Sequence, residues 1–503
     1  MDRKTQAIVG LGILVRIIFW LTAPVTGDGG LNFYASKYLA DHIAPPAVGV
    51  VGVVPLWYPP LFHILTAIIY TATGILTLSP LVFGVAGLLM FHRFASRFYP
   101  KQSFTAAAVL AFLPFHVYYC GIGYFETLMF FLAVCALHFY YSFLESADSR
   151  DFAYAAGASA LCALTHYHGF VVVAALSLHL FAKNWKKGLL FFVIAVVLAS
   201  PWYARNYAVF GNPIWPKVSG GYYPKDVEAI QGRPFVDSIR DLPNPSRWVT
   251  LFFDFWIGAP NSGDELAHKI DVALKTYPYG MMPLLFWFLA ALGFTLAAAY
   301  GAAHMVGHRR AMLPLILFLG SLVPFSSSVS ARMFTPLAPF LIIAISEGVG
   351  KIDIKFEKSF KGAPMRSPAV VLAALLLICM LGASYAYSYT YRNIRAGYAP
   401  FWDEMASLPA GSRIIMPFNV QECLYFSGRQ CLRLGTMGGG IPRPDGSDME
   451  RVLSQYRADY VCCTSINWDA QSLSDKAVCD SFTGRKAVID YDSGNIWGRC
   501  WAA

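Results

Sequence analysis

Two carboxylates are the residues of this chain best placed to do chemistry. Asp28 lies in the polar segment Thr26–Gly30, directly after the first apolar stretch, and Glu126 stands alone before a later one. A carboxylate at a membrane rim can take a proton from an attacking group or bind the hydroxyls of a sugar. If both acids lie on one side of a bilayer, they predict an acid/base or sugar-recognition pair at a membrane surface.

The composition predicts an integral membrane protein. The 503 residues are 56% hydrophobic and 14% charged, the mean hydropathy is +0.48, and apolar runs of about 17–20 residues recur. The first run, from Ile8 to about Ala23, lacks a small-x-small cleavage site, so we interpret it as a retained span. The net charge is +9, and most Lys and Arg residues lie between apolar runs, as the positive-inside rule predicts. No basic patch interleaved with aromatic residues is found, so a nucleic-acid partner is not expected.

Charged loops assign a side to each segment. Arg3 and Lys4 place the N-terminus in the cytoplasm, so Asp28 is expected outside. The basic segments expected in the cytoplasm are Arg93–Lys101, Lys183–Lys187, His308–Arg310 and Lys351–Lys361. The segments expected outside are the loop that holds Glu126, Thr165–Gly169, Arg205–Tyr279 and Ser326–Arg332.

The number of predicted membrane spans depends on the segment Leu61–Leu78. A full span there would invert every later side, but the preceding Trp57-Tyr58-Pro59-Pro60 is typical of a re-entrant or interfacial helix at the outer surface. This interpretation predicts about eleven transmembrane helices and puts Asp28 and Glu126 on the same outer side. The expected spans are 8–24, 80–97, 103–120, 127–144, 152–165, 169–183, 187–203, 281–300, 311–325, 333–350 and 368–388.

The composition changes near the end of the chain. We expect a membrane module over 1–390, with outer loops 25–79 and 204–280, and an extracytoplasmic α/β domain over 391–503. Short β-like runs occur at Arg413–Met416 and Asp459–Cys462. Six of the ten cysteines lie in this tail, which suggests disulfides in an oxidising compartment; buried free thiols are the alternative. The six are Cys423, Cys431, Cys462, Cys463, Cys479 and Cys500.

Several strings in order resemble the GT-C glycosyltransferases, especially the branch with protein O-mannosyltransferases and lipid A aminoarabinose transferases. The resemblance covers roughly residues 8–350. This chain departs from the family pattern at two positions. Gly29 follows Asp28 where the family often has a second acid, and Phe125 precedes Glu126 where the family often has Arg. The strings are Asp28, Tyr58-Pro59-Pro60-Leu61, Tyr118–Glu126, Leu164–Gly169, Ser200–Tyr207, Phe210–Pro213 and Ala331–Phe334 with Pro336 and Pro339.

The resemblance implies a transferase that takes one sugar, hexose or pentose, from a polyprenyl-phosphate carrier such as a dolichyl phosphate. The acceptor would be a lipid, a glycan or a protein at the outer face of the plasma or inner membrane. The branch it resembles is generally independent of metals, so neither a cofactor nor a metal is expected.

Each candidate residue has a functional and a structural interpretation. Asp28 is expected to be the catalytic base, and Glu126 a second active-site carboxylate; the alternatives are a cap for a helix beginning near Leu31 and an acid at a helix N-terminus. Arg205 and Arg332 are expected to bind the donor phosphate, because guanidinium groups match phosphate oxygens; interface anchoring is the alternative.

The remaining candidates lie at the outer turns. His166 or His168 would assist at the donor phosphate or only pack there, and on a helix the two would point to different faces. Tyr58 and Asn206 are expected to contact the acceptor or to shape the site.

One charge is expected inside the membrane. Arg16 falls within the first span, where it would extend to the surface or pair with an outer acid. A transporter or a lipid-linked-sugar flippase is the alternative function, but it would require charged residues through several spans.

Overall fold

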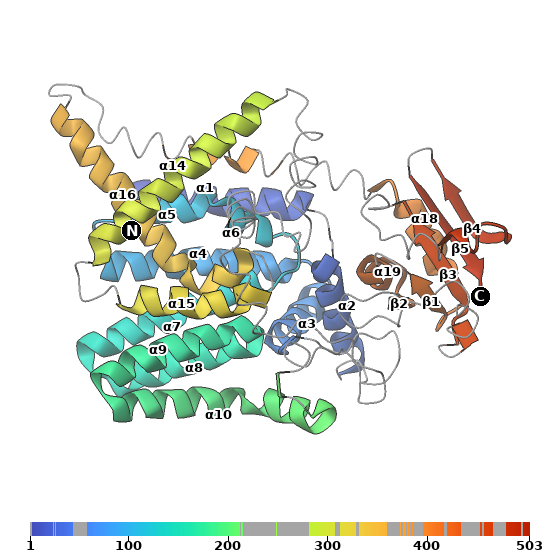
Figure 1. Ribbon diagram of the computed structural model, residues 1–503, viewed down its shortest axis with the longest axis horizontal. Helices are drawn as coiled ribbons and strands as arrows, with labels where there is room; N and C mark the ends of the chain where they lie inside the picture. Colours follow the sequence, from blue (N-terminus) through green and yellow to red (C-terminus); the bar gives the residue numbers. More distant parts are fainter. Residues whose placement is uncertain are drawn as a thin grey trace.

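The structure is a computed structural model of the whole chain. It describes residues 3–23, 25, 27–43, 58–211, 213–214, 248, 281–306, 312–327, 331–359, 373, 376–378, 380–382, 385, 396–416, 420–433, 453–454, 457–465, 479–493 and 496–503. A bundle of long helices forms one part, and a small domain with a β-sheet forms the other (Figure 1). The helices α2 and α3 lie between the two parts.

Long apolar helices make the bundle. The bundle helices are α1 (Arg3–Thr22), α4 (Leu78–Phe98), α5 (Ser103–Phe112), α6 (Pro114–Tyr119), α7 (Glu126–Ser146), α8 (Ser149–Thr165), α9 (Phe170–Lys183), α10 (Trp185–Phe210), α14 (Met281–Val306), α15 (Met312–Ser327) and α16 (Ala338–Ser359). Six described helices are long and apolar enough to cross a membrane. The total of about eleven spans stays a prediction, because most of 368–388 lies outside the described residues.

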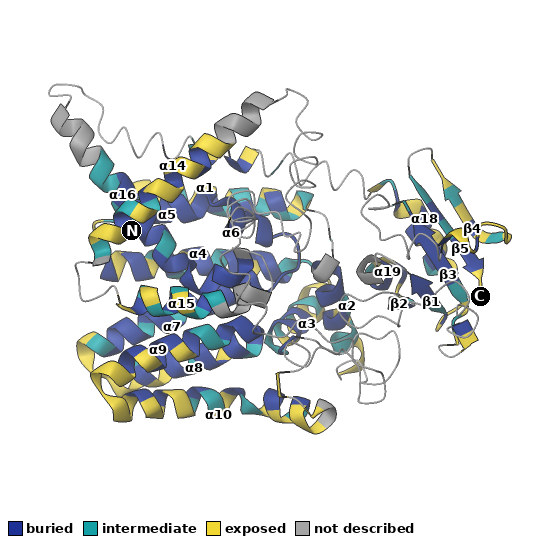
Figure 2. Ribbon diagram, viewed as in Figure 1, coloured by how far each residue is buried: buried dark blue, intermediate teal, exposed yellow. Residues whose placement is uncertain are grey.

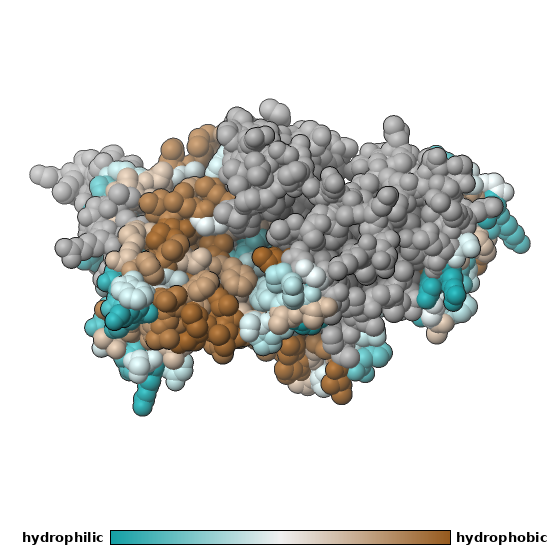
Figure 3. Space-filling view, turned by 60° about the horizontal axis from the view of Figure 1, so that its bottom comes forward, coloured by the Kyte–Doolittle hydropathy of each residue, from teal (hydrophilic) through white to brown (hydrophobic). Residues whose placement is uncertain are grey.

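The bundle has a buried centre and an apolar outer face. Most of α7 is buried, whereas α10 exposes much of its length (Figure 2). Exposed side chains on α10 include Val197 and Leu198, whose exposed fractions are 60% and 51%. Hydrophobic surface gathers over the described part of the bundle (Figure 3). A contiguous apolar surface of this kind is suited to lipid, and the chain has the fold of an integral membrane protein.

Short turns join neighbouring helices. Asp148 caps α8, where its side chain accepts the Arg150 N–H at 2.8 Å. Asn184 alone links α9 to α10 and accepts the Lys187 N–H at 3.1 Å. Such caps satisfy amide groups that the first helical turn leaves without partners. They let helices reverse within one or two residues, so that α7 to α10 pack side by side.

Two of the predicted spans are interrupted. The expected span 103–120 divides at Leu113 into α5 and α6, because Pro114 has no N–H with which to continue the helix. The expected span 333–350 begins instead as a 3-10 helix, η2 (Ala331–Leu337), which contains Pro336. Sequence hydropathy does not detect either change, since both halves are apolar.

The helices α2 (Gly27–His42) and α3 (Leu61–Thr73) pack on each other at one end of the bundle. With 13 residues, α3 spans only about 20 Å, which is short for a bilayer of about 30 Å. This length agrees with the expected surface or re-entrant helix. The expected start of α2 near Leu31 is wrong: the helix begins four residues earlier, so Asp28 lies in its first turn.

The C-terminal domain contains a five-stranded mixed sheet in the order β2-β1-β3-β5-β4. Its β1 (Arg413–Met416) is parallel to β2 (Gln430–Arg433) and to β3 (Tyr460–Thr464), whereas β5 (Trp497–Ala502) is antiparallel to β3 and to β4 (Ala487–Asp492). The helices α18 (Ala399–Ser407) and α19 (Val420–Ser427) pack with this sheet. The sheet agrees with the expected β-like runs.

Three disulfides link the six cysteines of this domain. They join Cys423 to Cys431, Cys462 to Cys500, and Cys463 to Cys479. Successive residues of a strand point to opposite faces of a sheet. The adjacent cysteines of β3 therefore attach it on both faces, one to β5 and one to the segment that precedes β4.

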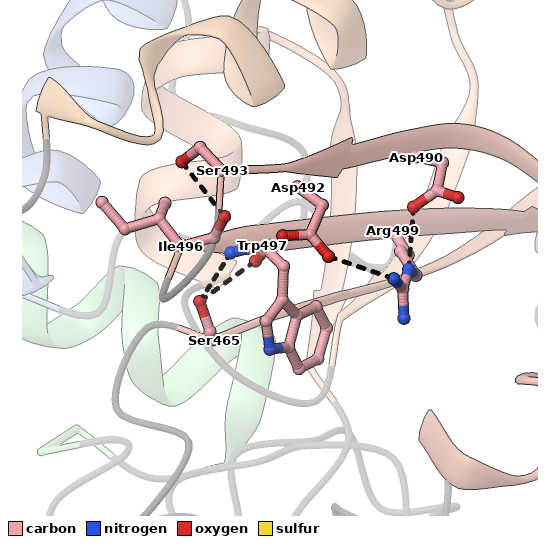
Figure 4. A network of polar contacts seen from close by, with 7 residues as sticks. All are labelled: Ser465, Asp490, Asp492, Ser493, Ile496, Trp497 and Arg499. Atoms are coloured by element: carbon pink, nitrogen blue, oxygen red, sulfur yellow. Dashed lines mark hydrogen bonds and ion pairs between the residues drawn. The ribbon is translucent and has the colours of Figure 1, made fainter.

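Polar pairs hold the antiparallel edge of the sheet (Figure 4). Arg499 of β5 lies opposite Asp490 of β4, and its Nε donates to that carboxylate at 2.8 Å. Asp492 accepts from Arg499 Nη2 at 3.5 Å. Ser465 Oγ accepts the Trp497 N–H at 2.8 Å. These contacts join β5 to β4 and to the residue that follows β3.

Candidate active site

The turn Cys120–Phe125 connects α6 to α7 and is the centre of the candidate site. Gly123 in this turn has φ +76°, and the Phe33 ring lies where a side chain at Gly123 would be. Glycine is required here by both the backbone conformation and the space. The turn delivers Glu126 as the first residue of α7, with an exposed fraction of only 2%. The expectation of an acid at a helix N-terminus is confirmed.

The first turn of α2 packs directly on this acid-bearing turn. A Cβ at Gly29 would collide with the carbonyl oxygen of Ile122. One helical turn further on, the buried Asn32 donates from Nδ2 to the carbonyl oxygen of Gly123 at 3.0 Å. The backbone of α2 therefore brings Asp28 to the turn that precedes Glu126; the side chain of Asp28 lies outside the described part of the chain.

The close approach at Gly29 explains a departure from the family pattern. A second acid directly after Asp28 would collide with the backbone of the Ile122 turn. Glycine permits the contact because it has no side chain. A second acid does not fit at this position because α2 packs directly on the turn.

A cluster of three rings covers one side of the turn. The rings of Tyr58 and Phe125 lie 4.6 Å apart, Tyr58 and His166 lie 4.9 Å apart, and Phe125 and His166 lie 4.5 Å apart. All three side chains are buried. The ring of Phe125 occupies the place where the family pattern often has Arg, so this position contributes packing here instead of charge.

The two histidines are closer together than the sequence predicts. His166 is extended, with φ −157°, and η1 (Tyr167–Gly169) follows it. The helical periodicity we assumed does not apply here, and the ring centres of His166 and His168 lie 3.9 Å apart. The backbone N–H of His168 donates to Nδ1 of His166 at 3.2 Å. A neutral His166 therefore carries its proton on Nε2, which can donate to an anion.

Arg332 approaches the same turn from η2. Its side chain is buried, and Cζ lies 5.7 Å from the centre of the Tyr124 ring. A guanidinium over an aromatic face gains a cation–π attraction. Because Tyr124 lies two residues before Glu126, this contact places a positive charge beside the acid-bearing turn.

Arg205 and Asn206 lie near the end of α10. Arg205 Nη1 donates to Asn206 Oδ1 at 2.9 Å, and its Cζ lies 4.9 Å from the Trp202 ring centre. Tyr167 of η1 packs on Tyr203 of α10, with ring centres 6.2 Å apart. The part of α10 that carries Arg205 therefore contacts the histidine turn, whereas Arg332 contacts the acid-bearing turn.

A residue that the sequence analysis placed wrongly supports the whole arrangement. Arg16 neither extends to the surface nor pairs with an acid: its guanidinium donates to the carbonyl oxygens of Gly12, Ala111 and Leu110 at 2.8, 3.0 and 2.8 Å. Nη2 also lies 2.9 Å from Nδ1 of His116. Leu110 is the residue whose carbonyl would bond to the N–H that a proline at 114 lacks. Arg16 therefore satisfies the end of α5 and holds the break that leads into the acid-bearing turn.

The positioning roles of Gly29, Gly123 and Asn32 were not predicted from the sequence. Two glycines are weak signals in a chain with 41 of them. Asn32 had a detectable signal, since it lies four residues after Asp28 and hence on the same face of a helix. An amide at that spacing, just inside a helix that follows a membrane span, was the available clue to the packing of α2.

The helical bundle, the surface helices and the C-terminal sheet together define the fold class: a membrane helical bundle joined to a small domain with a mixed sheet. In a comparison with solved structures, the chain is similar to ArnT from Cupriavidus metallidurans bound to undecaprenyl phosphate, with TM-score 0.61 and 12% identity over 98% of this chain and 97% of ArnT. It is also similar to the archaeal oligosaccharyltransferase AglB from Archaeoglobus fulgidus in complex with an inhibitory peptide and a dolichol-phosphate, with TM-score 0.57 and 13% identity over 98% of this chain and 74% of AglB. No family model and no curated protein sequence matches. The expected resemblance to GT-C proteins is confirmed at the level of the fold.

Proposed function

We propose that this protein is an integral membrane glycosyltransferase that moves one sugar from a polyprenyl-phosphate carrier to an acceptor at the outer face of the membrane. The observation that carries the proposal is the packing of the first turn of α2 on the turn before Glu126. It brings the elements of both acids together at one end of the bundle. The histidine turn and Arg332 adjoin the same turn.

The proposed reaction is a displacement at the anomeric carbon of the sugar. A hydroxyl or amine of the acceptor forms a bond to that carbon while the bond to the phosphate oxygen breaks. The bonding electrons leave with the polyprenyl phosphate, and the acceptor proton passes to Asp28. Glu126 orients the acceptor from the start of α7. Tyr58 and Asn206 shape the surrounding walls.

The leaving phosphate requires positive charge and hydrogen-bond donors. Negative charge grows on its oxygens as the bond breaks, and donors already in place stabilise that charge most effectively. We assign this role to Arg332, with Arg205 and the histidine turn of His166 and His168 around the phosphate. The proton on Nε2 of a neutral His166 makes it a donor without requiring a net charge.

The solved structures support the class of donor. ArnT was solved with undecaprenyl phosphate, and AglB with a dolichol-phosphate; both ligands are polyprenyl-type lipid phosphates. We carry this donor class over to the present chain. The acceptor class stays open among lipid, glycan and protein.

The transporter or flippase predicted as an alternative has weaker support. Such a mechanism would require polar or charged groups along a pathway through the spans. The buried charge of α1, Arg16, is bound to backbone carbonyls of α1 and α5. Its contacts explain it as a structural element, which favours the enzyme.

The test is transfer by purified protein with a polyprenyl-phosphate sugar. Asp28→Asn keeps the shape and removes the base, so turnover should fall at least about tenfold, since general bases contribute about 10²–10⁴-fold. Asp41→Asn in the same helix is the matched control. Asp41 is exposed and pairs with Lys37 at 2.5 Å, and an exposed pair contributes little. Turnover near normal in Asp28→Asn would remove Asp28 from the role of base and make Glu126 the next candidate.

A further inference from the structure

A cavity lies at the end of the bundle opposite the candidate active site. It has a volume of about 530 Å³ and is lined by side chains from α1, α4, α5 and α7. One of these, His138, lies twelve residues after Glu126 along α7, which corresponds to about 18 Å of helix. The cavity is therefore separate from the candidate active site.

The lining is basic and rich in hydrogen-bond donors. Arg93 and Arg97 lie four residues apart on α4 and so on one face of that helix, joined there by His92 and Ser96. The buried His138 faces them from α7, with its ring 5.5 Å from that of Phe98. Ser103 adds a hydroxyl at the start of α5.

One acid at this end of the bundle pairs with a residue of the cavity lining, and the others have contacts elsewhere. Glu145 pairs with Arg97 at 3.4 Å, with both side chains about half exposed. Glu347 contacts Gln102 and Lys351, and Asp151 accepts from Ser146 Oγ at 3.3 Å. Among the described residues, no carboxylate pairs with Arg93. Two cations on one helix face repel each other, and a bound anion would offset that repulsion.

We infer that this cavity is an anion site for a phosphate group, distinct from the donor site. Guanidinium groups donate two parallel hydrogen bonds to phosphate oxygens, and imidazole and hydroxyl groups add further donors. Basic pockets between membrane helices are suited to lipid head groups. The phosphate of an anionic membrane lipid and a free phosphate share this chemistry.

The experiment uses the full chain, delipidated in uncharged detergent, and measures binding by native mass spectrometry. The probes are phosphatidylglycerol, diacylglycerol with the same acyl chains, and inorganic phosphate. We expect a phosphate-bearing probe to bind and diacylglycerol not to bind. Phosphatidylglycerol alone would identify a lipid as the source, and inorganic phosphate would identify a free anion.

The variant Arg93→Gln/Arg97→Gln should weaken binding at least about tenfold, because it removes charge-assisted hydrogen bonds. Lys183→Gln/Lys186→Gln removes equal charge from the same end of the bundle outside the cavity, and should bind as the wild type does. If the glutamine variant fails to fold, Arg93→Lys/Arg97→Lys is measured in its place, and it should retain part of the affinity for the phosphate-bearing probe. Equal binding by wild type and the Arg93→Gln/Arg97→Gln variant, or equal binding of diacylglycerol, would overturn the inference whatever the transferase assay gives.

Discussion

At the scale of single residues, the packing of the candidate site depends on two positions that have no side chain. Gly29 and Gly123 lack side chains where α2 and the acid-bearing turn meet. Their absence lets two backbones approach closely enough for the Asn32 hydrogen bond to form. The charged groups are thus positioned by residues that have no chemistry of their own.

Gly29→Ala should therefore damage the site without touching a functional group. The new Cβ would meet the Ile122 carbonyl oxygen, and relieving such overpacking costs about 1–3 kcal/mol. We expect a lower melting temperature and a loss of turnover. Gly10→Ala in α1 is the matched control, because nothing lies within 4 Å of the added atom. Equal melting temperatures for both variants would contradict the packing that we describe.

Arg332→Gln should act on donor binding before it acts on turnover. A phosphate contact made with the bound donor is lost in the ground state as well as in the transition state, so KM rises. We expect about a tenfold increase in KM for the polyprenyl-phosphate sugar, the size of one charge-assisted hydrogen bond. Arg150→Gln, at the other end of the bundle, should leave KM unchanged. An unchanged KM with reduced turnover in Arg332→Gln would assign this residue to the transition state alone.

At the scale of elements, hydropathy located most helices but not their interruptions. The apolar runs predicted α1, α4 and α7 well because a bilayer requires long apolar helices. The proline break between α5 and α6 and the 3-10 start at η2 are decided by backbone hydrogen bonds, to which hydropathy is insensitive. The contact between α2 and the turn before Glu126 joins residues about ninety positions apart, so only the folded chain reveals it.

Substitution of Arg16 would show how much its contacts stabilise the break between α5 and α6. Arg16→Leu would leave the Leu110 and Ala111 carbonyls without the donors they now have, and a buried group left unsatisfied costs about 1–3 kcal/mol. We expect thermal unfolding in detergent at a clearly lower temperature. Arg16→Lys should restore only part of the difference, because an ammonium cannot reproduce the guanidinium fork.

Arg3→Leu is the control for Arg16→Leu, since Arg3 is exposed in the same helix. The two variants remove the same charge from α1. If they unfold at the same temperature, the guanidinium contacts contribute nothing to holding the break. Arg16 would then be a tolerated charge instead of a support for the acid-bearing turn.

At the scale of the whole molecule, the C-terminal domain is joined to the helix that carries Asp28. Leu31 of α2 belongs to the same buried cluster as Phe401 and Trp402 of α18. Phe33 packs on Tyr425 of α19, with ring centres 6.1 Å apart. Figure 1 shows α19 beside α2. The domain thus packs against α2, the helix whose first turn holds the proposed base, and a change in the domain's packing would reach the site through α2.

The last prediction concerns the side of the membrane on which the C-terminal domain lies. The basic loops, with α3 as a surface or re-entrant helix, predict that the domain lies outside the cytoplasm, and its three disulfides persist best in an oxidising compartment. We expect alkaline phosphatase, which requires such a compartment, to be active when fused after Ala503. The same reporter fused after Lys183 should be inactive, because that loop is expected in the cytoplasm. Activity in the opposite pattern would reverse the whole topology, and the two acids would then face the cytoplasm together, since α2 and the turn before Glu126 are packed on each other.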